Sequence, residues 1–92
     1  MPSVTIHVPA PLQELTGGRS RIPIEATSVD GVLDALRECE PLLSDRLFVD
    51  GGELRGHVNL FLNGSDVRRL EGEDRTISSD VELFIVPSVA GG

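Results

Sequence analysis

Hydrophobic and polar residues alternate along four short stretches of the chain, and alternation with a period of two predicts half-buried β-strands. The four stretches are residues 3–8, 20–26, 58–63 and 81–86. In the last stretch Val81, Leu83 and Ile85 fall on one face, whereas Phe84 and Val86 fall on the other. We therefore expect each strand to bury one aliphatic face.

Between the second and third stretches the hydrophobic period changes to that of one helix face. The residues with this spacing are Val29, Val32, Leu33 and Leu36. Thr27 lies three residues before Asp30, a pattern that resembles a capping box and predicts the start of a helix. Pro41 predicts its end near Glu40, and residues 42–48 predict a second short turn of α- or 3₁₀-helix.

Turn residues separate the predicted strands. Pro9 ends the first strand and the glycine pair at 17–18 marks a turn, so the first two strands are expected to form a hairpin. Pro23 has no backbone N–H, which predicts an edge strand or a bulge for the second strand. The Asn-Gly pair at 63–64 is a strong hairpin signal, from which residues 66–70 are expected to return as a short strand.

The order of the predicted elements is strand, strand, helix, strand, short strand, strand. This order predicts an α+β fold in which a four- to five-stranded mixed sheet packs on one main helix. An N-terminal hairpin, a crossover helix and a C-terminal strand assemble as a β-grasp, or ubiquitin-like, fold with the first and last strands parallel at its centre. We expect residues 1–86 to form this domain and residues 87–92 to form a flexible C-terminal tail.

The composition limits the partners and the location of the chain. Its 92 residues are the length of one domain, and its net charge of −7 argues against nucleic acid as the main partner, because phosphate binding needs a basic surface. The same charge suits a partner with a basic docking face. No apolar run approaches the roughly 20 residues of a membrane span, and residues 1–8 lack the pattern of a signal peptide. We expect a soluble, cytoplasmic protein that is a monomer when free.

Neither a disulfide nor a metal centre is expected. Cys39 is the single cysteine, and His7 and His57 lack the spacing of a metal motif. We interpret Cys39 as a small buried or half-buried hydrophobic residue, His7 as a surface residue, and the dispersed acidic side chains as solvated charges.

All eight basic residues are arginine, and lysine is absent. Codon bias in a GC-rich genome is one explanation. The other is that a protein whose carboxyl terminus becomes activated carries few amines to attack it, since lysine is the side chain with a nucleophilic amine. Both explanations fit the sequence.

The residues at the C-terminus suit a reactive chain end. Gly91 and Gly92 have no Cβ, so they can thread a narrow channel and adopt backbone angles that other residues cannot. Ser88, Val89 and Ala90 are small enough to follow them. A carboxylate is a poor electrophile, so chemistry at this end requires prior activation, for example by transfer to AMP from ATP.

With these elements the chain resembles the ubiquitin-like sulfur carriers of the ThiS/MoaD family over essentially its whole length. The resemblance rests on the order of the elements and on the terminal Gly91-Gly92, which is the specific motif. Three segments are most similar to CysO-type carriers of that family: LTGG (15–18), HVNLFLNGSDVRRLEG (57–72) and VPSVAGG (86–92).

The resemblance implies that an activating enzyme of the MoeB/ThiF type uses ATP to adenylate Gly92, which then becomes a thiocarboxylate. It also implies delivery of the sulfur to a biosynthetic enzyme, such as a cysteine-synthase-like synthase. The protein would be a cosubstrate and not an enzyme, with no bound cofactor. Three alternatives stay open: the small subunit of molybdopterin synthase, a protein modifier that forms isopeptide bonds through Gly92, and a β-grasp binding module with an idle tail.

Three apolar residues predict a partner-binding surface. Phe61, Phe84 and Val86 fall on the sheet face opposite the helix, where exposed apolar groups mark a partner site when they form a patch. The alternative is that residues 41–54 fold over them as a second small core.

Arg68 and Arg69 are expected on the short strand beside this patch. They form either a solvated pair or a contact with an acidic rim of the partner. The resemblance implies that the sheet face and the tail, including Val89 and Ala90, meet the activating enzyme together.

Overall fold

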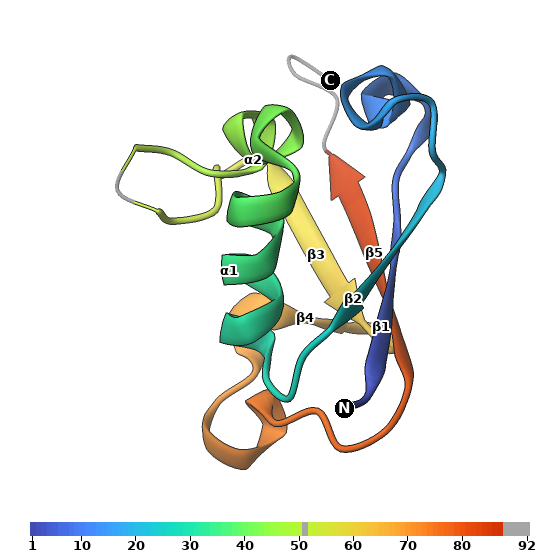
Figure 1. Ribbon diagram of the computed structural model, residues 1–92. Helices are drawn as coiled ribbons and strands as arrows, with labels where there is room; N and C mark the ends of the chain where they lie inside the picture. Colours follow the sequence, from blue (N-terminus) through green and yellow to red (C-terminus); the bar gives the residue numbers. More distant parts are fainter. Residues whose placement is uncertain (51, 88–92) are drawn as a thin grey trace.

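The computed structural model describes residues 1–50 and 52–87. Within them five strands form one mixed sheet in the order β2-β1-β5-β3-β4, and the two α-helices lie on one side of it (Figure 1). The strands are β1 (Ser3–His7), β2 (Arg21–Glu25), β3 (Val58–Leu62), β4 (Ser65–Asp66) and β5 (Val81–Pro87). The α-helices are α1 (Val29–Cys39) and α2 (Pro41–Leu47), and the 3₁₀-helices are η1 (Ala10–Thr16), η2 (Val67–Arg69) and η3 (Gly72–Arg75).

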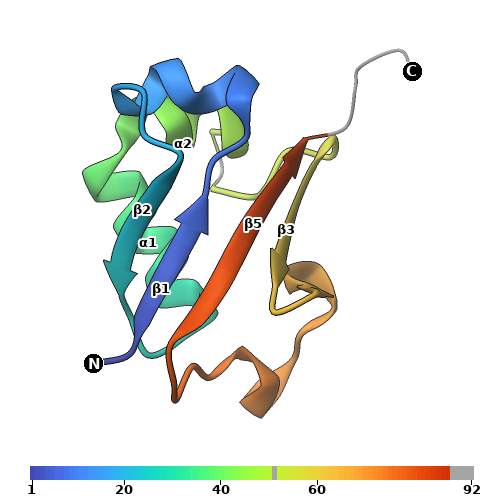
Figure 2. The same cartoon turned by 90° about the vertical axis from the view of Figure 1, so that its right-hand side faces the viewer.

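The centre of the sheet is the parallel pair of β1 and β5, seen side by side in Figure 2, which confirms the predicted β-grasp fold. Val4 pairs with Val81 and His7 with Phe84. β3 continues the sheet antiparallel to β5. β2 is an edge strand, as Pro23 predicts, because a proline has no N–H to give to a further strand.

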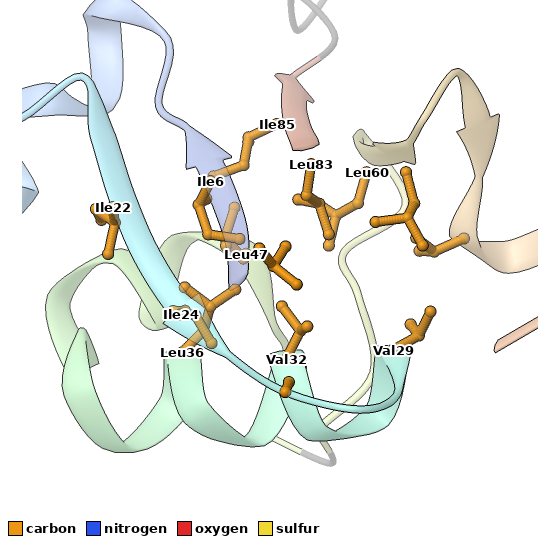
Figure 3. Packing of buried hydrophobic residues seen from close by; sticks show 14 of the residues in the cluster. Ile6, Ile22, Ile24, Val29, Val32, Leu36, Leu47, Leu60, Leu83 and Ile85 are labelled. Atoms are coloured by element: carbon orange, nitrogen blue, oxygen red, sulfur yellow. The ribbon is translucent and has the colours of Figure 1, made fainter. Parts of the chain in front are cut away.

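One hydrophobic core fills the space between the sheet and the helices (Figure 3). Ile6, Leu60 and Leu83 point into it from three neighbouring strands, and Val32 and Leu36 point into it from α1. All five side chains are completely buried, and each contributes roughly 1.5–3 kcal/mol relative to an exposed position. A shift of one residue in any of these strands would move its aliphatic set to solvent, so the core fixes the register.

The residue that caps the start of α1 is not the predicted one. Ser28, and not Thr27, is the N-cap, and its Oγ accepts a hydrogen bond of 3.0 Å from the N–H of Gly31. The carbonyl oxygen of Thr27 accepts a 2.8 Å bond from the N–H of Ile77. Serine and threonine are both good caps, so this long-range backbone bond, which local sequence does not reveal, places Thr27 outside the helix.

The alternative in which residues 41–54 cover the opposite face of the sheet as a second small core is wrong. α2 packs beside α1, and its inward side chains Leu43 and Leu47, together with Phe48, join the main core. The apolar residues of this segment are therefore already buried on the helix side. The other face of the sheet, which we call the open face, has no helix over it within the described residues (Figure 1).

The predicted short strand at 66–70 is also wrong, because β4 ends at Asp66. The Asp66 carboxylate accepts a 2.9 Å hydrogen bond from the N–H of Arg68 and so caps the 3₁₀ turn η2. The turn also brings Val67 into the core, where it is 2% exposed. Arg68 and Arg69 thus lie on a turn at the sheet edge.

Two residues at the end of α1 differ from expectation. Cys39 is exposed, because the buried stripe of the helix continues from Leu36 to Glu40 instead. Glu40 is not a solvated charge: its side chain is 11% exposed and pairs with Arg19 at 2.7 Å. This ion pair joins the β1–β2 connection to the corner between the two helices.

Candidate docking face

One row of side chains crosses all five strands in register on the open face. From edge to edge its members are Arg21, His7, Phe84, Phe61 and Asp66. Side chains that are directly opposite on adjacent strands lie about 5 Å apart, so neighbours in this row can touch. The row places two phenylalanines and a histidine at the centre of the face, with a charged residue at each end.

Phe84 and Val86 are each 43% exposed, although they lie on the central strand β5. Their exposure follows from the period of two, because Leu83 and Ile85 take the core positions of the same strand. In register with Val86 is Asn59 of β3, and Phe84 lies opposite Phe61. Two exposed large apolar side chains on one strand form a patch of the kind that marks a partner site.

The ring of His7 is stacked on the ring of Phe84. Their centroids are 4.1 Å apart and their planes differ by 7°. His7 Nε2 also lies 2.7 Å from Oε1 of Glu82, the residue two positions earlier on the outward face of β5. The contact with Glu82 orients the ring of His7, and the stacked ring of His7 holds Phe84 from one side.

Phe61 is half-buried and lines an open hollow at the β4 edge of the open face. The other residues that line this hollow are Gly64, Ser65, Asp66, Arg69 and Leu70. The hollow combines apolar surface from Phe61 and Leu70 with one cation from Arg69 and one anion from Asp66. It is therefore suited to an amphipathic side chain of a partner.

Arg68, in contrast, is engaged within the protein. Its Nη1 donates a 3.1 Å hydrogen bond to Oδ1 of Asn59, and its Nη2 donates a 2.7 Å bond to the carbonyl oxygen of Arg55. These bonds tie η2 to β3 and to the segment that precedes it. The sequence treats Arg68 and Arg69 as a pair, whereas the structure gives them different surroundings.

The last strand, β5, leads from the open face toward the chain end. Pro87 pairs with Val58, so the strand extends one residue further than predicted. Gly91 and Gly92, like Val89 and Ala90, lie outside the described residues. Their place in the sequence still puts them within five residues of Pro87, so the chain end follows the strand that carries the exposed apolar patch.

Sequence reasoning missed the role of His7 beside Phe84. The sequence could have indicated this contact, because the predicted parallel pairing of the first and last strands brings the outward residues of these strands together. The exact register was needed to show that His7, rather than Thr5, lies opposite Phe84.

The part of the chain that the structure describes holds no group of three or more His, Cys, Asp or Glu side chains that could bind a metal ion. None of its helices has the length and the apolar character needed to cross a membrane. His57 is exposed, and neither it nor Cys39 lies in the row that crosses the open face.

A five-stranded β-grasp sheet with one helix-covered face defines this protein as ubiquitin-like. The model of the ThiS family matches residues 6–92, and the chain belongs to this family.

Three similar proteins show what this family membership includes. The sulfur carrier protein CysO of Mycobacterium tuberculosis is 30% identical over 92 residues, which cover 98% of this chain and 99% of that protein. Small archaeal modifier protein 1 of Haloferax volcanii is 38% identical over 85 residues, which cover 90% of this chain and 93% of that protein. The crystal structure of the Amycolatopsis orientalis BexX/CysO complex matches with a TM-score of 0.80 at 28% identity, over 97% of this chain and 99% of that one. The protein is thus a member of a group of sulfur carriers and ubiquitin-like modifiers, small proteins that are not catalysts themselves.

Proposed function

We propose that this protein is a sulfur carrier whose C-terminal Gly92 is adenylated and converted to a thiocarboxylate. The observation that carries the proposal is that the strand with the exposed apolar patch is the last one before the chain end. Phe84 and Val86 are exposed on β5, and in the sequence three residues separate Pro87 from the Gly-Gly pair. A partner that docks on the patch would hold the chain end close to its own active site, which raises the effective concentration of the carboxylate.

The chemistry requires two steps, and ATP and the sulfur come from outside the carrier. In the first step a carboxylate oxygen of Gly92 attacks the α-phosphate of ATP, so that an acyl-adenylate forms and pyrophosphate leaves. In the second step a hydrosulfide donor attacks the carbonyl carbon; a C–S bond forms, the C–O bond to AMP breaks, and AMP leaves. Glycine at both final positions leaves no side chain to hinder either attack.

The carrier supplies positioning and the reacting carboxylate, and its partners supply the catalysis. The first partner is an activating enzyme of the MoeB/ThiF type, which docks on the open face. The second is a sulfur-accepting synthase, for which the similarity to CysO favours cysteine or a related sulfur-containing metabolite. The similarity to the CysO of a BexX/CysO complex supports docking of the carrier on a partner protein. We place these steps in the cytoplasm, with the free carrier as a monomer.

Intact-mass spectrometry tests the proposal. The protein is incubated with ATP, a purified activating enzyme of this type and sulfide, and we expect a mass gain equal to the difference between one sulfur and one oxygen atom. Fragmentation should place that gain on Gly92. No gain with an activating enzyme that converts its own carrier under the same conditions would contradict the proposal.

A second candidate function is protein modification, which the 38% identity to small archaeal modifier protein 1 favours. In that case the amine of a lysine on another protein attacks the adenylate, and an amide bond replaces the bond to AMP. The same incubation with a cell extract in place of sulfide distinguishes the two functions. Lysines of other proteins that carry, through an isopeptide bond, the C-terminal peptide that follows Arg75, the last tryptic site of the chain, and a carrier mass that does not change, would favour the modifier.

A further inference from the structure

The eight arginines fall into two groups according to their contacts. Five of them donate side-chain hydrogen bonds within the protein: Arg19, Arg37, Arg55, Arg68 and Arg75. The other three have neither a hydrogen-bond partner nor an ion-pair partner among residues 1–50 and 52–87: Arg21, Arg46 and Arg69. The first group is held by bonds within the fold, whereas each guanidinium of the second group has all of its N–H groups available for contacts with another molecule.

Within the second group Arg69 alone lines the hollow with Phe61. Arg21 lies on the edge strand β2, two strands away from Phe84. Arg46 lies on α2, on the helix side of the sheet (Figure 1). Position therefore separates Arg69, which lines the hollow, from Arg21 at the far end of the aromatic row and from Arg46 on the helix side.

We propose that Arg69 receives a carboxylate side chain of the activating enzyme, and that the hydrocarbon part of that side chain lies against Phe61 and Leu70. This inference rests on the proposed function, because it takes the open face as the surface on which that enzyme docks. The two neighbouring arginines then have different roles: Arg69 recognises the partner, and Arg68 holds η2 to β3.

The chemistry of the hollow supports a carboxylate. A guanidinium presents its N–H groups as a planar fork that matches a carboxylate, and it is less strongly hydrated than an ammonium, so it suits a partly desolvated contact. Asp66 also lines the hollow, but its carboxylate caps η2, and no ion pair between Asp66 and Arg69 is present in the described part of the chain. The apolar walls formed by Phe61 and Leu70 exclude water from one side of the contact.

This local preference is opposite to that of the whole molecule. The net charge of −7 favours a basic partner at long range, whereas Arg69 favours an acidic group at one point. If long-range attraction to a basic partner dominates, a charge reversal at Arg69 should strengthen binding. If the local contact of Arg69 with an acidic group dominates, the same reversal should weaken binding, so the experiment distinguishes the two.

The test compares Arg69→Glu with Arg46→Glu in carrier-dependent exchange between ATP and pyrophosphate, catalysed by a purified MoeB/ThiF-type enzyme. Each substitution changes the net charge from −7 to −9, since a positive charge is replaced by a negative one. We expect Arg69→Glu to raise the KM for the carrier roughly tenfold with kcat unchanged, and Arg46→Glu to change KM less than about twofold. Because both side chains are exposed, both variants should melt at the wild-type temperature.

Two outcomes would overturn the inference. One is an equal rise in KM for both variants, which would show that the total charge acts and not the hollow. The other is an unchanged or lower KM for Arg69→Glu, which would show that the partner presents no acidic group there.

Phe84→Ala, measured in the same assay, shows whether a failure concerns the role of Arg69 alone or the open face as the docking surface. If Phe84→Ala raises KM and Arg69→Glu does not, the face is correct and the role of Arg69 is wrong; if neither does, the docking face itself is wrong.

Discussion

Phe84 is an apolar side chain that the fold leaves exposed on the open face. It lies in the central strand of the sheet, yet 43% of it is exposed, because α1 and α2 cover only the other face. An exposed phenylalanine gains little for the folded state, and this one is held by the ring of His7 instead of by the core. A large apolar side chain that is both exposed and already ordered loses little conformational entropy when a partner covers it.

Replacement of Phe84 by alanine should therefore affect binding more than stability. We expect Phe84→Ala to raise the KM for the carrier at least about thirtyfold, as the loss of a binding hot spot of about 2 kcal/mol or more would, and to lower the free energy of unfolding by only about 1 kcal/mol. Phe48→Ala is the matched control, because Phe48 is 6% exposed, and its loss should cost about 3–5 kcal/mol. Kinetic assays and urea unfolding provide the two measurements. A stability loss for Phe84→Ala as large as that for Phe48→Ala would show that Phe84 belongs to the core.

His7 is expected to act as a positioning residue for Phe84. His7→Ala removes the stacked ring, and since an aromatic pair contributes about 0.5–1.5 kcal/mol beyond its buried area, KM should rise roughly two- to tenfold. His7→Phe keeps a ring but cannot contact Glu82 through a nitrogen, and it should restore most of the affinity. If both variants bind equally weakly, the contact with Glu82 and not the stack determines the position of Phe84.

At the scale of elements, the sequence predicts best where one local rule governs the structure. The period of two in residues 81–86 places the inward and outward residues of β5 correctly, and Pro23 predicts the edge strand. The predictions fail where a distant contact decides. Thr27 is displaced from the cap by its bond to Ile77, and residues 66–70 leave the sheet because Asp66 caps η2 and Val67 enters the core.

The two adjacent hydroxyl residues before α1 allow a direct test of the cap. Ser28→Ala removes the oxygen that accepts from Gly31 and should lower the free energy of unfolding by about 1 kcal/mol. Thr27→Ala is the control, since no side-chain bond of Thr27 is present in the described part of the chain, and it should change stability by less than about 0.5 kcal/mol. Thermal or urea unfolding measures both. A larger effect of Thr27→Ala than of Ser28→Ala would contradict the capping assignment.

At the scale of the whole molecule, the sheet has two faces with different roles. The helix-covered face stabilises the fold, and the open face and the strand end at Pro87 face solvent. The order of elements in the sequence predicts this architecture and which residues of β5 are exposed. It could not predict that Arg68 is bonded to Asn59 while Arg69 is not, because that difference depends on the exact path of η2.

The most direct test of the central claim, that the folded domain presents the carboxylate of Gly92 for activation, is the rate of ATP–pyrophosphate exchange with a MoeB/ThiF-type enzyme. Two forms of the carrier are compared, one with the free C-terminal carboxylate and one in which the same carboxyl group is blocked as a carboxamide. Because the amide has no anionic oxygen to attack the α-phosphate, we predict exchange with the free form and only the carrier-independent background with the blocked form. Equal exchange rates for the two forms would contradict the account.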